Sequence, residues 1–299
     1  MKKVLQGVVV PAVTPLDDQE HIDIQSLSNL IERLVTHGVD GIFILGTMGE
    51  FAAITDSERT VLVENTVKIT NGRMKVFCGV GDCGTKRVVE NAFQVQKWGI
   101  DALVPLLPYY YPQRRPGENR KFLSEFIKGV NKPVVFYENI IMTRRELSYD
   151  DFEWVKNQPE IIGLKDSSGD ISKFERLTGI FSDRKDFGIL TGTGEQALEC
   201  LMAGGHGIVP GLGSLVPGLC VEIYRAGMEG RWKECKELQD RYVSLTRIYG
   251  PKREYWPGAQ KTALKFLGIM DDNVASPYFR LNDEERKFVK EILIEEGII

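Results

Sequence analysis

The stretch GIFILG (residues 41–46) begins a pattern that is completed by TDSE (residues 55–58) and KVFCGV (residues 75–80). The first and last of these segments are almost continuously apolar and lack the alternation of a strand with one face in water. This is typical of strands buried on both faces. The middle segment is a capping box, the usual start of an amphipathic helix. Together the three segments predict a strand, a helix and a second strand that runs parallel to the first.

The same unit recurs along the chain. Further apolar runs of strand length lie at residues 7–14, 101–106, 133–138, 161–166, 188–193 and 205–211. Helix patterns open between them, for example at Ser148 and Asp170. Eight strand–helix units predict an α/β fold, the (β/α)8 TIM barrel, because right-handed crossovers stack parallel strands until the sheet closes. An open doubly wound sheet is the alternative.

The last part of the chain carries helix patterns only. They lie near residues 231–249, 258–267 and 282–295. These residues are too few to need a sheet of their own. We therefore expect a catalytic barrel domain at residues 1–230 and a C-terminal helical extension, packed on the barrel, at residues 231–299.

Charge, the length of the apolar runs and the cysteine count argue against several classes of partner and compartment. The 38 basic and 42 acidic residues leave a net charge of −4, so we expect no nucleic-acid partner. The apolar runs are far shorter than the roughly 20 residues of a membrane span. Residues 1–4 lead into the first strand pattern without the apolar stretch of a signal peptide. Five scattered cysteines, an odd number, indicate a reducing compartment, and we expect the cytoplasm.

Metal and nucleotide sites lack their usual sequence patterns. The three histidines are isolated and have no paired carboxylates beside them, so we expect no metal. The segment GVGDCG (residues 79–84) fits a dinucleotide-binding loop, but the acidic residue of the next strand, Asp101, stands at its beginning instead of its end. The segment also fails as a phosphate-binding P-loop, because Thr85 occupies the place of the lysine.

Three polar side chains follow predicted strands, where the active sites of barrels lie. Lys165 comes directly after an apolar run. Burial lowers the pKa of a lysine, and the neutral amine attacks ketones to form a Schiff base. Tyr137 ends the neighbouring strand and can transfer protons, and Thr47 stands in a glycine-rich loop whose backbone N–H groups suit an anion. The alternatives are a rim lysine that reaches solvent and a tyrosine packed in the core.

In order and spacing, these motifs resemble the pyruvate-dependent class I aldolases typified by dihydrodipicolinate synthase and N-acetylneuraminate lyase. The matching segments are PAVTPL (11–16), GTMGE (46–50), PYY (108–110), Tyr137 and IGLKD (162–166). The resemblance implies a lyase in which Lys165 forms a Schiff base with pyruvate or another 2-oxo acid. It also implies that Tyr137 is the proton shuttle, and that Thr47 and Met48 hold the carboxylate of the 2-oxo acid.

The resemblance also implies an assembly and further site residues. The tyrosine that matches Tyr110 reaches, in the synthases, into the neighbouring subunit's site, and the family usually forms homotetramers that are dimers of dimers. Ile208 matches the strand that lines the pyruvate pocket. The substrate is bound covalently, so no metal or organic cofactor is expected. The expected partners are a small 2-oxo acid and further copies of the chain, with no nucleic acid and no membrane.

Two methionines depart from the synthase pattern. Met48 replaces a hydroxyl residue of the proton relay, and Met142 stands where the synthases carry an arginine that binds the second substrate's carboxylate. These changes favour a 2-keto-3-deoxy sugar acid aldolase-like or hydratase-aldolase-like lyase. The alternative is a dihydrodipicolinate synthase, which condenses pyruvate with aspartate semialdehyde in lysine biosynthesis. Glu138 is a candidate substrate ligand beside Tyr137, or else it points outward into the layer between the barrel and its helices.

Two other functions stay open on the sequence. The glycine loops after the last two predicted strands, at residues 192–194 and 211–213, are compatible with a barrel enzyme that acts on sugar phosphates. Met48 is compatible with a non-catalytic relative that binds a 2-oxo acid without converting it.

Overall fold

The computed structural model describes residues 5–299, so residues 1–4, where the sequence predicts the approach to the first strand, lie outside the described residues. Parallel strands close into a barrel in which each strand pairs with the next one and β1 pairs with β8. The strands are β1 (Gly7–Pro11), β2 (Gly41–Ile44), β3 (Lys75–Gly79), β4 (Ala102–Val104), β5 (Val134–Glu138), β6 (Ile161–Asp166), β7 (Gly188–Thr191) and β8 (Gly207–Ile208). The predicted TIM barrel is confirmed, and the open sheet is excluded.

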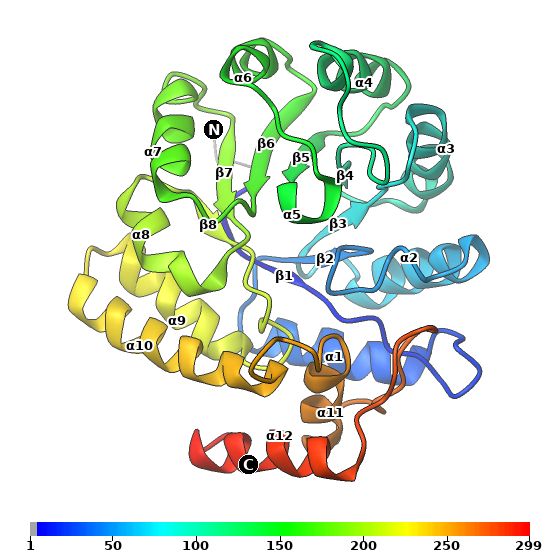
Figure 1. The fold of residues 1–299 in the computed structure, drawn as a ribbon, viewed down its shortest axis with the longest axis vertical. Coiled ribbons are helices and arrows are strands. Elements are labelled where there is room, and N and C mark those ends of the chain that lie inside the picture. Colours follow the sequence, from blue (N-terminus) through cyan, green and yellow to red (C-terminus); the bar gives the residue numbers. More distant parts are fainter. Residues whose placement is uncertain (1–4) are drawn as a thin grey trace.

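Helices surround the barrel and return the chain from each strand to the next (Figure 1). They are α1 (Ile24–Thr36), α2 (Asp56–Thr70), α3 (Thr85–Val95), α4 (Glu118–Lys128), α5 (Ile140–Thr143), α6 (Tyr149–Lys156), α7 (Ile171–Ile180), α8 (Ala197–Met202) and α9 (Pro217–Met228). Side chains of Thr55, Ser148 and Asp170 cap α2, α6 and α7, as their sequence patterns predict. Within residues 5–299, no helix combines the length and the apolar character needed to cross a membrane.

The strands are buried on both faces, and alternate residues serve two separate cores. Inward-facing side chains such as Phe43, Phe77 and Leu190 fill the barrel interior. Outward-facing neighbours such as Ile42 and Phe136 pack against the helices in a larger outer core. The fold therefore decides, residue by residue, which strand side chains reach the mouth of the barrel.

The C-terminal extension packs on the barrel (Figure 1). It contains α10 (Trp232–Leu245), the short 3-10 helix η3 (Thr246–Tyr249), α11 (Gly258–Phe266) and α12 (Asp283–Glu295). The buried Tyr242 hydroxyl accepts a hydrogen bond of 3.1 Å from the backbone N–H of Leu212, in the loop after β8. The buried ammonium of Lys261 pairs with the buried carboxylate of Glu50, in the loop after β2. The extension therefore reaches the end of the barrel at which the strands finish.

Candidate active site

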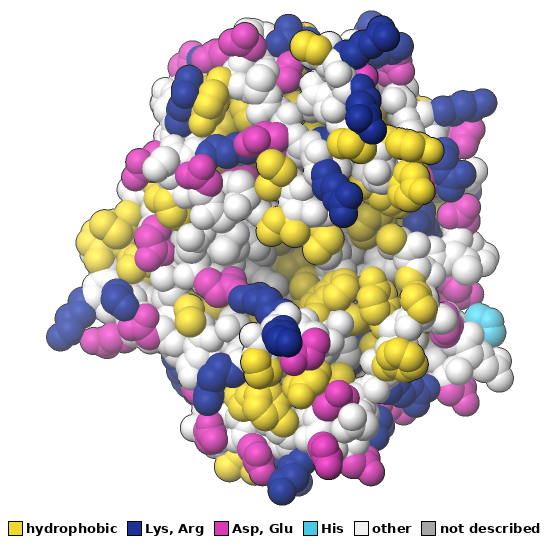
Figure 2. Space-filling view, viewed as in Figure 1, with side chains coloured by type: hydrophobic (Ala, Val, Ile, Leu, Met, Phe, Trp, Pro, Cys, Tyr) yellow, Lys and Arg dark blue, Asp and Glu magenta, His cyan; other side chains and the backbone are white. Residues whose placement is uncertain are grey.

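A cavity of about 410 Å³ opens at the carboxyl ends of the strands. Figure 2 shows it as a hollow near the centre of the face, with hydrophobic side chains gathered beside it. Side chains from β5, β6 and the loops after β2, β7 and β8 line it, together with one from the C-terminal extension. Its position is that of the active site in TIM-barrel enzymes.

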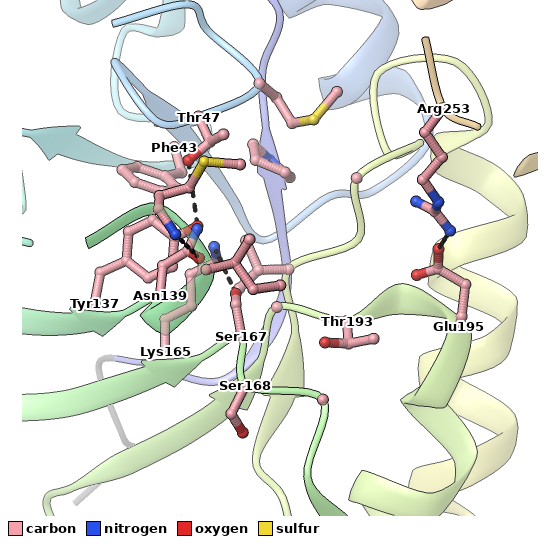
Figure 3. A pocket seen from close by; sticks show the side chains of 18 residues that line it. Phe43, Thr47, Tyr137, Asn139, Lys165, Ser167, Ser168, Thr193, Glu195 and Arg253 are labelled. Carbon is pink, nitrogen blue, oxygen red and sulfur yellow. Dashed lines mark hydrogen bonds and ion pairs between the residues drawn. The ribbon is translucent and has the colours of Figure 1, made fainter. Parts of the chain in front are cut away.

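Lys165 lies in this cavity on β6, directly opposite Tyr137 of β5 in the strand register. Its side chain is buried, and its Nζ lies 3.4 Å from the centre of the Tyr137 ring and 5.6 Å from that of Phe43. Nζ donates a hydrogen bond of 3.3 Å to the hydroxyl of Ser167 (Figure 3). Burial lowers the pKa of the Lys165 ammonium, although Tyr137 partly offsets this. The lowered pKa makes the nucleophilic, neutral amine easier to reach than it is for a lysine in water.

The hydroxyl of Tyr137 is held from two sides. Asn139 Nδ2 donates a hydrogen bond of 2.8 Å to it, and Thr47 Oγ1 lies 3.4 Å away. Burial alone would raise the pKa of Tyr137, but the charge of Lys165 and the hydrogen bonds around the phenol outweigh burial and lower it. A buried phenol with a lowered pKa beside an amine can pass a proton to and from a reacting substrate.

Thr47 and Met48 also line the cavity, and the C-terminal extension supports their loop. Trp256 Nε1 donates to Met48 Sδ at 3.3 Å. Glu50 adopts a left-handed backbone conformation, and its Oε2 accepts from the backbone N–H of Ala275 at 2.8 Å. The loop after β2 is thus fixed by contacts with residues more than two hundred positions away in the sequence.

Two residues predicted to bind substrate point away from the cavity. Ile208 packs in the outer core, and the next residue, Val209, lines the cavity. The structure therefore places Val209, and not the predicted Ile208, on the cavity wall. Of the two alternatives for Glu138, the structure has the outward one, because its carboxylate lies 2.7 Å from Lys173 Nζ and accepts from the backbone N–H of Leu147 at 2.9 Å.

Tyr110 does not line the cavity either. Its side chain is 76% exposed, and its ring meets that of Tyr111 edge to face. Its backbone is left-handed, with φ 78°. The contact of Tyr110 with a neighbouring subunit stays a prediction.

The structure brings in side chains that sequence reasoning missed. Asn139 lies directly after β5, two residues beyond Tyr137, and caps α5. Asn139, Ser167, Thr193, Glu195 and Arg253 form part of the cavity wall. Met142, which the sequence resemblance matches to the synthase arginine, also lines the cavity. Within residues 5–299, no group of three or more His, Cys, Asp or Glu side chains is arranged to hold a metal ion.

Comparison with known proteins shows which family has this sequence. The family model of the Dihydrodipicolinate synthetase family matches residues 4–296. The chain belongs to this family. It is 30% identical to a 4-hydroxy-tetrahydrodipicolinate synthase of Bartonella bacilliformis, and the match covers 99% of each chain. It is 27% identical to a probable 2-dehydro-3-deoxy-D-pentonate aldolase of Escherichia coli, over 100% of this chain and 99% of that one.

Solved structures of the family have the same fold. The chloride-inhibited dihydrodipicolinate synthase of Acinetobacter baumannii, crystallised with pyruvate, superimposes with a TM-score of 0.92 and is 25% identical in sequence. The match covers 99% of this chain and 100% of that one. The present chain is therefore a lyase of the dihydrodipicolinate synthetase family, and the resemblance drawn from its sequence is confirmed.

Proposed function

We propose that this family member is a Schiff-base lyase that cleaves a 2-keto-3-deoxy sugar acid to pyruvate and an aldehyde, or catalyses the reverse condensation. It works without metal or organic cofactor. The observation that carries the proposal is the buried Lys165 amine, 3.4 Å from the centre of the Tyr137 ring in a cavity at the strand ends. The residue types and their placement suit covalent catalysis on a ketone.

The proposed reaction begins when the neutral amine of Lys165 attacks the C2 ketone to form a carbinolamine. Tyr137 gives its proton to the carbinolamine hydroxyl, which leaves as water, so that an iminium ion and the phenolate of Tyr137 are formed. Tyr137 takes the proton from the C4 hydroxyl. The C3–C4 bond breaks, the aldehyde leaves, and the electron pair passes to the iminium, which becomes an enamine. Protonation at C3 and hydrolysis then release pyruvate and restore the amine.

The remaining residues orient the substrate. Thr47, with the backbone N–H groups of Thr47 and Met48, binds the carboxylate of the 2-oxo acid, since the loop after β2 stands beside Tyr137. Asn139 donates to the Tyr137 hydroxyl at 2.8 Å, which stabilises the phenolate when Tyr137 has given up its proton.

The choice of substrate rests on Met142. A thioether cannot anchor a second carboxylate. Arg145, three residues further on, is held elsewhere, because its guanidinium donates to the backbone oxygen of Tyr111 at 3.0 Å and to Asn119 Oδ1 at 3.1 Å. This favours a sugar acid over the synthase reaction with aspartate semialdehyde.

We further propose that the protein is a cytoplasmic homotetramer, a dimer of dimers in which Tyr110 reaches the neighbouring site. The side chains of Tyr110 and Tyr111 are mostly exposed and in contact with each other. An exposed aromatic pair is typical of an interface. Within residues 5–299 all five cysteines are free thiols, which supports a reducing compartment. Sedimentation velocity measures the subunit number.

The proposed function is tested by incubating the protein with 2-keto-3-deoxy sugar acids of five and six carbons and measuring pyruvate release. We expect turnover of at least one. If only pyruvate with aspartate semialdehyde reacts, the protein is a dihydrodipicolinate synthase. If pyruvate binds and no substrate turns over, the protein is a non-catalytic binding relative. If only a phosphorylated sugar reacts, and pyruvate is not bound, the protein is a sugar-phosphate enzyme.

A further inference from the structure

The far side of the cavity from Lys165 carries an ion pair that the proposed chemistry does not use. Arg253 Nη2 lies 2.6 Å from Glu195 Oε1, and both residues line the cavity. In Figure 3, Arg253 and Glu195 point toward each other on the opposite side of the view from Lys165 and Tyr137, with Thr193 between the two groups. The Arg253 side chain is 62% exposed, so its remaining guanidinium N–H groups are accessible to a ligand.

The position of Arg253 is built into the fold. It belongs to the segment between η3 and α11, and its backbone is left-handed, with φ 58°. The backbone N–H of Arg253 donates a hydrogen bond of 3.0 Å to the backbone oxygen of Gly250. The backbone N–H of Tyr255 donates one of 3.0 Å to the backbone oxygen of Tyr249. These hydrogen bonds hold the backbone of Arg253 in this conformation, with its side chain on the cavity lining.

The chemistry of this end of the cavity suits hydroxyl groups. The Glu195–Arg253 pair has no net charge, and it offers both acceptors and donors. Thr193 adds a hydroxyl to the same lining, whereas Met142 on another part of the lining is apolar. A second carboxylate bound to Arg253 would lie beside the like charge of Glu195, so an uncharged tail is favoured.

We propose that Arg253 is a specificity-determining residue that donates hydrogen bonds to the hydroxylated tail of the substrate, while Glu195 holds the guanidinium and accepts from a tail hydroxyl. This inference rests on the proposed function. It says which part of the substrate the far side of the cavity binds, namely a polyhydroxylated chain without a terminal anion. It also gives the C-terminal extension a direct part in substrate choice, through a residue outside the barrel.

The test compares two substrates of equal length in the full-length protein. One is a six-carbon 2-keto-3-deoxy sugar acid with hydroxyls along its tail, and the other is 4-hydroxy-2-oxohexanoate, which keeps the reacting hydroxyl and lacks the others. The variant Arg253→Met keeps much of the side-chain length and removes the donors. Arg231→Met is the matched control, because Arg231 also lies in the C-terminal extension and pairs with Glu229 on the surface.

We expect Arg253→Met to lower kcat/KM for the sugar acid by roughly 10- to 100-fold, the loss expected for hydrogen bonds from a charged donor. Cleavage of 4-hydroxy-2-oxohexanoate stays within about twofold of wild type, as does every activity of Arg231→Met. An equal loss on both substrates, or no loss on either, overturns the proposal. The proposal is also overturned if wild type prefers a substrate whose tail ends in a carboxylate and Arg253→Met abolishes that preference.

Trapping with pyruvate and borohydride separates this proposal from the proposed function. If wild type and Arg253→Met trap pyruvate equally and only the tail discrimination is missing, the Schiff-base function stands and the role of Arg253 is wrong. If wild type traps no pyruvate, the proposed function fails, and the tail-recognition proposal fails with it.

Discussion

Replacing Glu138 with glutamine is expected to change how the stability of the protein depends on pH. The Glu138 carboxylate is fully buried and lies 2.7 Å from Lys173 Nζ. Burial raises its pKa to about 7, because the opposing effects of Lys173 and of the Leu147 N–H offset only part of the desolvation. In the unfolded chain a glutamate titrates near 4.3. Between these two values the folded protein therefore holds a proton that the unfolded chain has released.

The size of the effect follows from this difference in protonation. Stability falls by about 1.4 kcal/mol per pH unit where the native state binds one proton more than the unfolded state. The contribution of Glu138 is full below the unfolded pKa and is lost as the pH rises through about 7. Between about pH 5 and about pH 7 the loss amounts to roughly 2 kcal/mol, because the native carboxyl begins to ionise at the upper end.

Glutamine has nearly the same shape and does not titrate. The free energy of unfolding of Glu138→Gln, taken relative to wild type, is therefore expected to rise by about 2 kcal/mol from about pH 5 to about pH 7. Denaturant unfolding at several pH values measures it, provided that the m-value is unchanged. Glu146→Gln is the matched control, because Glu146 contacts the same Lys173 at 2.7 Å but is about half exposed. A difference that stays constant over this range would refute the reasoning.

Three further predictions concern the site and its support. Tyr137→Phe is expected to lower kcat by about 10²- to 10⁴-fold, the usual contribution of a general acid–base group, while intact mass still detects pyruvate trapping; unchanged kcat would remove Tyr137 from the chemistry. Lys261→Met leaves the buried carboxylate of Glu50 unpaired and is expected to lower the unfolding free energy by about 3–5 kcal/mol. Denaturant unfolding checks this against Lys265→Met, which should cost far less because the Lys265 side chain is 45% exposed. Met142→Arg is expected to raise kcat/KM for synthesis from aspartate semialdehyde by roughly tenfold through a charged anchor, and a coupled reductase assay that finds no increase would contradict the role given to Met142.

The barrel and the centre of the site were predictable because their signals are local. Each strand is a continuous apolar run, and several helices begin at a capping residue, so strand number and order follow from the sequence alone. Lys165, Tyr137 and Thr47 could be selected because each stands at or just after a strand end, and a barrel brings strand ends together. The structure places all three on one cavity.

The side of the strand on which a residue lies was not predictable for Glu138 and Ile208. A strand buried on both faces shows no alternation of polar and apolar residues, so the sequence does not say which neighbour faces the barrel interior. The structure turns Glu138 and Ile208 outward, with Tyr137 and Val209 inward. A one-residue change of register reverses that assignment.

The sequence also did not predict the site residues that come from the distant C-terminal extension. Arg253 and Trp256 reach the site from the C-terminal extension, where the sequence shows only helix patterns and a short connecting segment. Their role depends on how α11 packs beside the loop after β2, through the buried pair of Lys261 and Glu50. Such tertiary placement leaves no periodic signal in the sequence.

The central claim is that Lys165 forms a Schiff base with a 2-oxo acid. Incubation with pyruvate, reduction with borohydride, intact mass and peptide mapping test it most directly. We expect the mass of one reduced pyruvate adduct per subunit, located on Lys165 and absent from Lys165→Ala. No increase in mass, or an increase that persists in Lys165→Ala, would contradict the account.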